Sequence, residues 1–157
     1  MPLEKESVFV FSSNGNEAFV TPAALSASLA VAGMCLGTAL RIKDKEQRSL
    51  SVGYLVASFI GGVTEPGLYG VGMRYKRPFL GMIIGGFAGG LYAGIMGVTA
   101  YTLVPVASIL CVFSFAGGTV SNLVQGAISL VISFVVATIV AYFLGFKKDD
   151  PLIKKQQ

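Results

Sequence analysis

The sequence contains no histidine and no tryptophan, and charged residues make up only 13% of its 157 residues. That share is about half of what a soluble domain carries. It has two cysteines, Cys35 and Cys111, both within apolar stretches and neither in a Cys-x-x-Cys pair. Without histidine or paired cysteines, the sequence indicates neither a metal site nor a disulfide framework, and we expect no cofactor. Both cysteines are expected to be small buried hydrophobic residues.

Hydrophobic residues make up 54% of the chain, and its mean hydropathy is +0.72. Eleven of the twelve lysines and arginines fall in three clusters, at 41–48, 74–77 and 147–155. The sequence pI of about 9.2 is compatible with nucleic-acid binding. However, these clusters sit at the ends of apolar runs, as cations that flank membrane segments do. We therefore expect the lipid bilayer, and no nucleic acid, as a partner.

The lengths of the apolar runs predict an all-α, multi-pass membrane protein. Residues 18–40 are 23 positions without a charge, long enough to cross a hydrocarbon core of about 30 Å. Two further spans are expected over 78–99, which is rich in glycine spaced for close helix packing, and over 123–146. The segment 101–118 is expected to be a half-helix or a bent segment outside the membrane, because proline and glycine interrupt it.

A shorter run, residues 50–63, is only 14 residues long and would reach about 21 Å as a helix, too little to cross. It lies between the first two basic clusters, which positive-inside logic places together in the cytoplasm. We therefore predict a re-entrant hairpin with Glu65 near its tip. The alternative is one kinked span over 50–73. The whole chain then has about three spans plus the hairpin, with the N-terminus outside.

Glu65 is the only acidic residue between Glu46 and Asp149. A charge within the membrane costs roughly 2.5–3.5 kcal/mol on insertion scales and needs a cavity, a partner or a ligand to offset it. The following Pro66 and Gly67 are expected to stop a helix there, and irregular backbone at membrane depth is tolerated only where protein buries it or it lines a wet cavity. A charge, a broken helix and a cavity together indicate a transport site.

The motif Gly-Val-Thr-Glu-Pro-Gly-Leu-Tyr-Gly at 62–70 is followed by Arg-Tyr-Lys-Arg-Pro-Phe at 74–79. Together they resemble the membrane IIC component of the bacterial sugar phosphotransferase system, of the beta-glucoside and sucrose type in the glucose superfamily. The resemblance covers about residues 14–146. It implies that Thr64 and Glu65 bind sugar hydroxyls from a re-entrant hairpin. Gly67, where the family normally has alanine, is included in the predicted sugar-binding segment.

The resemblance also implies what surrounds the site. The sequence itself divides into a polar N-terminal segment (1–16), a membrane region (17–146) and a basic tail (147–157) expected in the cytoplasm; the resemblance implies that 17–146 is part of a IIC domain in a bacterial cytoplasmic membrane. The expected partners are a sugar, a phosphorylated IIB domain, the missing N-terminal half of IIC, and a second copy in a homodimer of the complete transporter. Neither Cys35 nor Cys111 has the polar surroundings of a phosphocysteine. The chain would thus be a membrane component of the phosphotransferase with no catalytic residue of its own.

Three alternatives remain at this level. Glu65 could instead pair with Arg74 or Lys76 to hold the hairpin closed. The chain could be a truncated or split, non-transporting remnant that acts only as an assembly or regulatory subunit. A generic channel is a third reading, weakened because a single carboxylate gives little selectivity unless the chain oligomerises. A neighbouring reading frame that supplies the missing spans would favour the transporter over the remnant.

Overall fold

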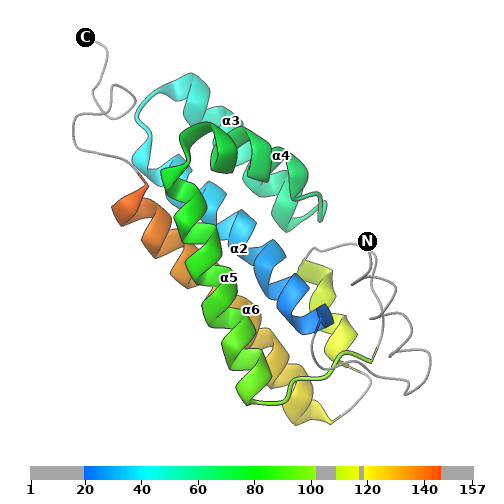
Figure 1. The fold of residues 1–157 in the computed structure, drawn as a ribbon. Helices are drawn as coiled ribbons and strands as arrows, with labels where there is room; N and C mark the ends of the chain where they lie inside the picture. Colours follow the sequence, from blue (N-terminus) through cyan, green and yellow to red (C-terminus); the bar gives the residue numbers. More distant parts are fainter. Residues whose placement is uncertain (1–19, 102–108, 117–118, 146–157) are drawn as a thin grey trace.

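The computed structural model describes residues 20–101, 109–116 and 119–145. The predicted N-terminal segment (1–16) and tail (147–157) lie outside them. The described elements are helical, and Figure 1 shows their arrangement. In chain order they are α2 (Val20–Arg41), α3 (Lys45–Phe59), α4 (Glu65–Gly67), the π-helix η1 (Leu68–Met73), α5 (Arg77–Ile95), the 3-10 helix η2 (Ile109–Phe115) and α6 (Val120–Leu144).

Three of these helices, α2, α5 and α6, are long and apolar enough to cross a membrane by length and composition. The prediction of an all-α protein with about three such helices is confirmed, and their bounds lie within a few residues of the expected spans. Within the segment 101–118, which was predicted to be bent, the structure describes one regular element, the 3-10 helix η2. Residues 102–108 and 117–118 lie outside the described residues.

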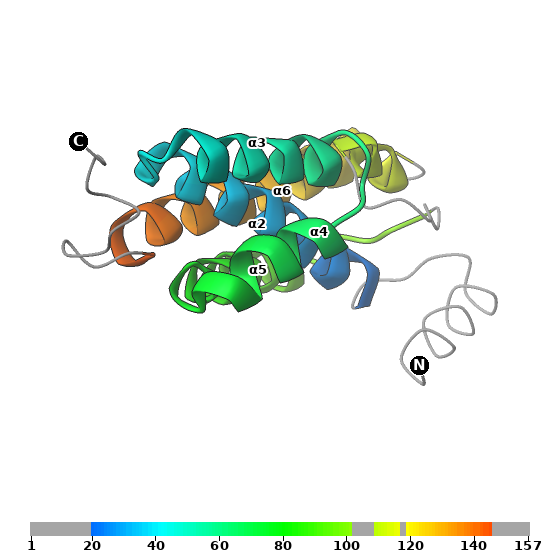
Figure 2. The same ribbon diagram turned by 90° about the horizontal axis from the view of Figure 1, so that it is seen from above.

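The centre of the fold is α2, which contacts α5, α6 and α3. Figures 1 and 2 show α5 and α6 against it and the α3–α4 hairpin lying along another side. Long apolar side chains on the outer faces of α5 and α6 stay exposed, which is the pattern of helices that face lipid. These side chains include Leu80, Ile83, Ile84, Phe87, Leu91, Val124, Ile128, Val131, Val135 and Ile139.

Glycines of α5 permit its close approach to α6. A Cβ built on Gly85 would lie 2.6 Å from the Cβ of Ala137 and 2.7 Å from the carbonyl oxygen of Ser133. Gly81 and Gly89 meet α6 in the same way, whereas Gly86 faces Ala27 of α2. The predicted packing role of this glycine run is therefore confirmed. Small residues have this use in membranes because van der Waals contact, and not water exclusion, drives helix association.

Hydroxyl groups join the three long helices where their backbones are closest. Ser26 of α2 lies 3.1 Å from the hydroxyl of Ser129 on α6, and Ser129 donates to the carbonyl of Gly89 on α5 at 2.9 Å. Ser133 donates to the Ser26 carbonyl. All three serines are buried, so their partners satisfy polar groups that lipid cannot solvate. This polar seam fixes the register of the bundle.

At the end of α5 remote from the hairpin, Asn122 of α6 holds the chain that leaves α5. It accepts from the Thr99 N–H at 2.9 Å and donates to the Thr99 carbonyl at 2.7 Å. It also donates to the Phe115 carbonyl at 3.2 Å, which connects η2 to the same point. The Asn122 side chain thus satisfies three backbone groups that lie outside the regular hydrogen bonding of α5 and α6.

We predict that Gly85→Ala destabilises the protein by about 1–3 kcal/mol, because overpacking a tight contact forces the backbones apart. Gly94→Ala is the matched control on the same helix, since a Cβ there would meet nothing within 4 Å. It should be neutral or slightly stabilising, as alanine favours helix. Thermal unfolding in a mild detergent measures both, and equal effects would contradict the α5–α6 contact.

Candidate functional site

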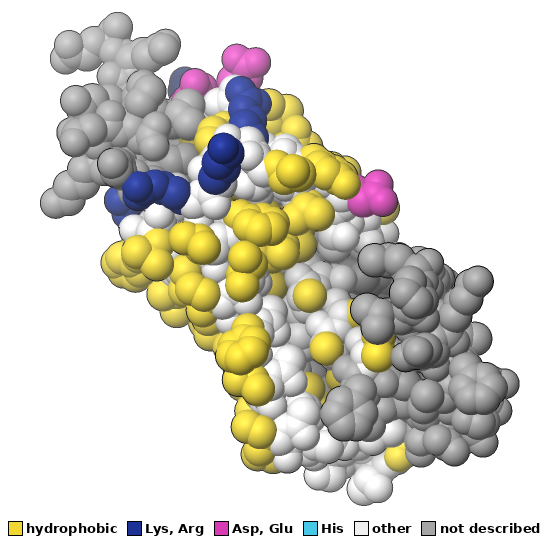
Figure 3. Space-filling model, in the orientation of Figure 1, with side chains coloured by type: hydrophobic (Ala, Val, Ile, Leu, Met, Phe, Trp, Pro, Cys, Tyr) yellow, Lys and Arg dark blue, Asp and Glu magenta, His cyan; other side chains and the backbone are white. Residues whose placement is uncertain are grey.

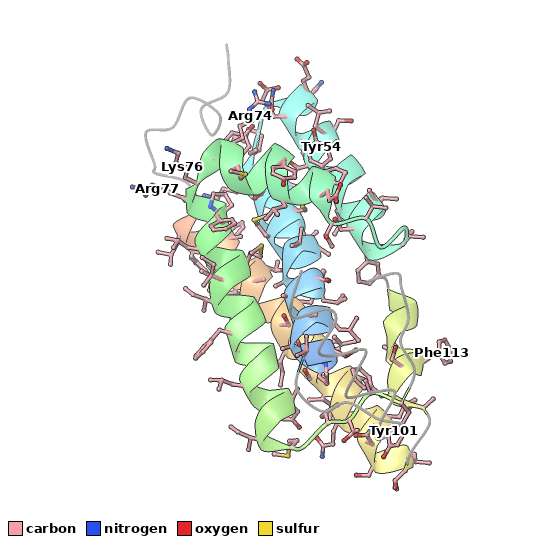
Figure 4. All side chains as sticks on the ribbon, turned by 45° about the vertical axis from the view of Figure 1, so that its right-hand side comes forward. Tyr54, Arg74, Lys76, Arg77, Tyr101 and Phe113 are labelled. Atoms are coloured by element: carbon pink, nitrogen blue, oxygen red, sulfur yellow. The ribbon has the colours of Figure 1, made fainter. Side chains whose placement is uncertain are left out.

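Residues 45–75 form a hairpin that leaves and returns to the same end of the bundle. At its base, the Tyr75 hydroxyl donates to Oε1 of Gln47 at 2.9 Å. Farther along, Gly70 of η1 packs directly against the ring of Tyr54 on α3, and Figure 4 shows Tyr54 between the two arms. The two arms are antiparallel neighbours, so the alternative of a single kinked span over 50–73 is wrong.

The turn at the tip is made by a glycine upstream of the predicted breaker. Gly62 has φ +69°, and the Val63 N–H donates back to the Ala57 carbonyl at 3.1 Å, which closes the end of α3. Pro66 and Gly67 do not stop a helix, contrary to the sequence expectation. They lie inside α4, where proline is compatible because the first N–H groups of a helix have no internal partner.

Thr64 and Glu65 lie next to each other at the start of α4. Thr64 is half-buried, and its hydroxyl makes no capping bond to the helix. Its carbonyl accepts from the Leu68 N–H at 2.9 Å. The Glu65 side chain is exposed. The tip therefore presents a hydroxyl and a carboxylate together, outside the packed core.

Gly67 faces the opposite way, into the protein. It is buried, and a Cβ there would lie 2.9 Å from Sγ of Cys35, 3.0 Å from Cγ1 of Val31 and 3.2 Å from Oγ of Ser58. Its φ of −67° suits any residue, so space and not backbone conformation favours glycine. The structure gives Gly67 a packing role behind the tip, while its predicted sugar contact stays a prediction.

Sequence reasoning missed how the hairpin docks on α2. Cys35 is buried as expected, but its contact with Gly67 could not be read from spacing. The side chain of Cys111 lies outside the described residues. Met34 and Val71 complete the buried cluster between α2 and η1. Two further glycines, at 70 and 72, were the available signal, because each lets η1 approach a large neighbouring side chain.

The interpretation that Glu65 pairs with Arg74 or Lys76 is wrong. Within the described part of the chain, no ion pair joins Glu65 to either cation. Glu65 begins α4 at the tip, whereas Arg74 and Lys76 follow η1 at the base, where Figure 4 shows them. The intervening helix separates them by on the order of 10 Å. Among the described residues, the carboxylate is thus left without a cation partner.

Comparison with known proteins identifies relatives over most of the chain. It is 37% identical over 144 residues to the PTS system beta-glucoside-specific EIIBCA component of Bacillus subtilis (strain 168). The aligned region covers 92% of this chain and 23% of that protein. The chain is homologous to part of the sugar-specific PTS EIIBC and EIIBCA components. The resemblance to the beta-glucoside and sucrose type is thereby confirmed.

Two other relatives carry related names. The PTS system arbutin-, cellobiose-, and salicin-specific EIIBC component of Escherichia coli (strain K12) is 29% identical over 88% of this chain and 28% of its own length. The sucrose-specific EIIBC component of B. subtilis (strain 168) is 29% identical over 84% of this chain and 28% of its own length. The chain therefore spans about a quarter of the length of these relatives. No family model and no solved structure matches it.

We predict that both ends of the hairpin face the cytoplasm. Cysteines introduced at Lys45 and at Lys76, one at a time in a background with Cys35 and Cys111 replaced by alanine, should both react with an impermeant maleimide only from the cytoplasmic side. Both positions are exposed. Reaction of both from the outside would invert the orientation, while reaction from opposite sides would contradict the hairpin itself.

We predict that Gly67→Ala destabilises the protein by about 1–3 kcal/mol, because the added Cβ overpacks the contact with α2. In a Cys35→Ala background the cost should fall, since the closest opposing atom is gone. Gly53→Ala on α3 is the control, because a Cβ there meets nothing within 4 Å. Thermal unfolding of Gly67→Ala, Cys35→Ala, the double variant and Gly53→Ala measures the coupling between Gly67 and Cys35. Equal costs of Gly67→Ala in both backgrounds would contradict the contact between these two residues.

Proposed function

We propose that this chain is the substrate-site portion of a sugar permease of the phosphotransferase system, in a bacterial cytoplasmic membrane. Glu65 and Thr64 bind hydroxyl groups of the sugar. The observation that carries the proposal is an exposed carboxylate, with no ion-pair partner among the described residues, at the tip of a hairpin whose sequence is homologous to sugar-specific PTS components.

The chemistry of the tip suits a sugar. An ionised carboxylate accepts hydrogen bonds at about four lone-pair sites, so Glu65 can accept from two neighbouring hydroxyls at once. The Thr64 hydroxyl can both donate and accept. Hydrogen bonds to a charged group are the strong kind, and they offset the cost of holding the carboxylate in a membrane.

The length of the hairpin supports a site within the membrane. Helix α3 has 15 residues, which corresponds to about 22 Å. If the basic base lies at the membrane surface, the tip reaches beyond the midplane of a hydrocarbon core of about 30 Å. Glu65 would then meet a sugar that enters from the outside, while the base faces a phosphorylated IIB partner in the cytoplasm.

The remaining walls of the site come from other parts of the transporter. The relatives are about three to four times as long as this chain, and a re-entrant tip with an exposed carboxylate needs neighbours that exclude lipid. We propose that the rest of IIC supplies those neighbours, from a separate polypeptide or from sequence continuous with this one, and that the complete transporter is a homodimer.

The test is Glu65→Gln, which keeps the shape of the side chain and removes its charge. Loss of a charge-assisted hydrogen bond should weaken sugar binding by about 1.5–3 kcal/mol, or roughly ten- to a hundredfold. Binding of radiolabelled salicin, cellobiose and sucrose is measured in membranes from cells that express the chain with its neighbouring reading frames. The amount of protein in the same membranes is quantified by immunoblot.

Glu46→Gln is the matched control, because Glu46 is also an exposed carboxylate on the hairpin but lies at its base. It should leave sugar affinity unchanged. Both variants should reach normal abundance, since Glu65 makes no ion pair with the hairpin cations. Normal affinity in Glu65→Gln, for a sugar that the unmodified protein binds, would rule out the assignment of Glu65 to the sugar site.

A further inference from the structure

Cations from three separate segments gather at the hairpin end of the bundle. Arg41 ends α2, Arg48 lies in the first turns of α3, and Arg74, Lys76 and Arg77 connect η1 to α5. We call these five residues the basic surface. Figure 3 shows lysine and arginine side chains gathered at this end, and Figure 4 shows Lys76 and Arg77 directed away from the bundle.

Exposed aliphatic side chains border the basic surface on the sequence segments that form it. Leu40 precedes Arg41 and is 56% exposed, and Met73 precedes Arg74 and is 59% exposed. Leu80, one turn after Arg77, is 49% exposed. Each of these segments therefore carries an exposed aliphatic residue close in sequence to a cation, which suits a surface that meets both lipid headgroups and acyl chains.

Two of the arginines are held by aromatic rings and not by carboxylates. The guanidinium of Arg41 lies 5.3 Å from the ring centroid of Tyr142, and that of Arg74 lies 5.6 Å from that of Tyr75. Stacking positions a guanidinium while leaving its N–H edge available. No described carboxylate forms an ion pair with the basic surface. Asp44 and Glu46 lie at the same end of the bundle, at the start of α3, so the five cations outnumber the acidic residues there.

Lys76 occupies a backbone conformation that favours glycine. Its φ is +55°, and it is the one described non-glycine residue with positive φ. It is the residue immediately before α5, and its N–H donates to the Gly72 carbonyl at 2.9 Å. An L-residue is disfavoured there, so a lysine at this position points to a use for the ammonium group that outweighs the backbone cost.

We propose that the basic surface binds the phosphate groups of anionic phospholipids, and so fixes the depth at which the hairpin sits. The headgroups would lie against the cations while the acyl chains follow Leu40, Met73 and Leu80 into the hydrocarbon. Since the arms of the hairpin are rigid helices, holding the base at the headgroups also holds Glu65 at a set depth. This inference does not depend on which ligand Glu65 binds.

A phosphorylated protein is the other source of phosphate that such a surface could meet. The exposed side chains of Leu40 and Met73 favour the lipid. Acyl chains would cover them, whereas a soluble phosphorylated protein that bound only through its phosphate would leave them exposed to water. The spread of the cations over α2, α3 and the α5 start also suits several separate headgroups better than one phosphoryl group. The experiment below distinguishes the two sources.

The full chain is purified in a zwitterionic detergent and titrated with phosphatidylglycerol in phosphatidylcholine mixed micelles. We expect phosphatidylglycerol to raise the unfolding temperature and phosphatidylcholine not to. Replacing Arg74, Lys76 and Arg77 together by glutamine should weaken the response to phosphatidylglycerol by about a hundredfold, since each of the three interfacial cations contributes about a fivefold factor. An unchanged titration would overturn the proposal.

Two further variants keep the test clear of folding defects. Arg74→Lys with Arg77→Lys retains both charges and should retain most of the phosphatidylglycerol effect. Lys76→Gly relieves the positive φ, so it should be at least as stable as the unmodified protein in phosphatidylcholine while responding less to phosphatidylglycerol. An undiminished response in Lys76→Gly would remove Lys76 from the site.

Competition identifies the source of the phosphate. Inorganic phosphate, compared with sodium sulfate and chloride at the same ionic strength, should leave the phosphatidylglycerol effect in place beyond ordinary screening. If inorganic phosphate alone abolishes the effect, the surface is specific for a water-borne phosphate and the assignment to lipid is wrong.

Discussion

The structure depends on the close packing of α2 against helices on two sides. On one side Gly33 and Gly37 bring its backbone against α6. On the other, Val31 and Cys35 receive Gly67 from the hairpin. Because glycine carries no side chain, backbones approach closely enough for dispersion contacts and hydroxyl–carbonyl bonds to replace the hydrophobic effect, which provides no driving force between helices in lipid.

That packing explains how a chain that is mostly hydrophobic can hold a polar hairpin tip in place. A re-entrant hairpin exposes the backbone groups of its turn, and lipid cannot satisfy them. Here Gly62 closes α3 with backbone bonds, and the Ser58 hydroxyl donates to the Val63 carbonyl at 3.3 Å. The turn therefore satisfies much of its own hydrogen bonding before any partner arrives. The hydroxyl of Thr64 makes no capping bond and the carboxylate of Glu65 is exposed, so both are available for the ligand that we propose.

The two ends of the hairpin have opposite chemistry. The tip carries one carboxylate. At the base, cations outnumber the carboxylates of Asp44 and Glu46, and aliphatic side chains border them. If both opposite charges lay at one place, they would neutralise each other and the carboxylate would be lost as an acceptor. The helical arms keep them apart, and the bond between Tyr75 and Gln47 closes the base. If lipid headgroups hold the base at the membrane surface, as we propose, the helical arms also set the depth of the tip.

The sequence by itself determined the all-α class, the three apolar helices, the hairpin and the position of Glu65 near its tip. These follow from hydropathy, segment length and charge, because the preference of each residue for lipid or water does not depend on which other helices it contacts. Only the tertiary structure decided that Gly62 makes the turn, that Gly67 faces Cys35 and that Glu65 lies far from Arg74. Those outcomes depend on which faces of separate helices meet, and that is set by the volumes of residues distant in sequence.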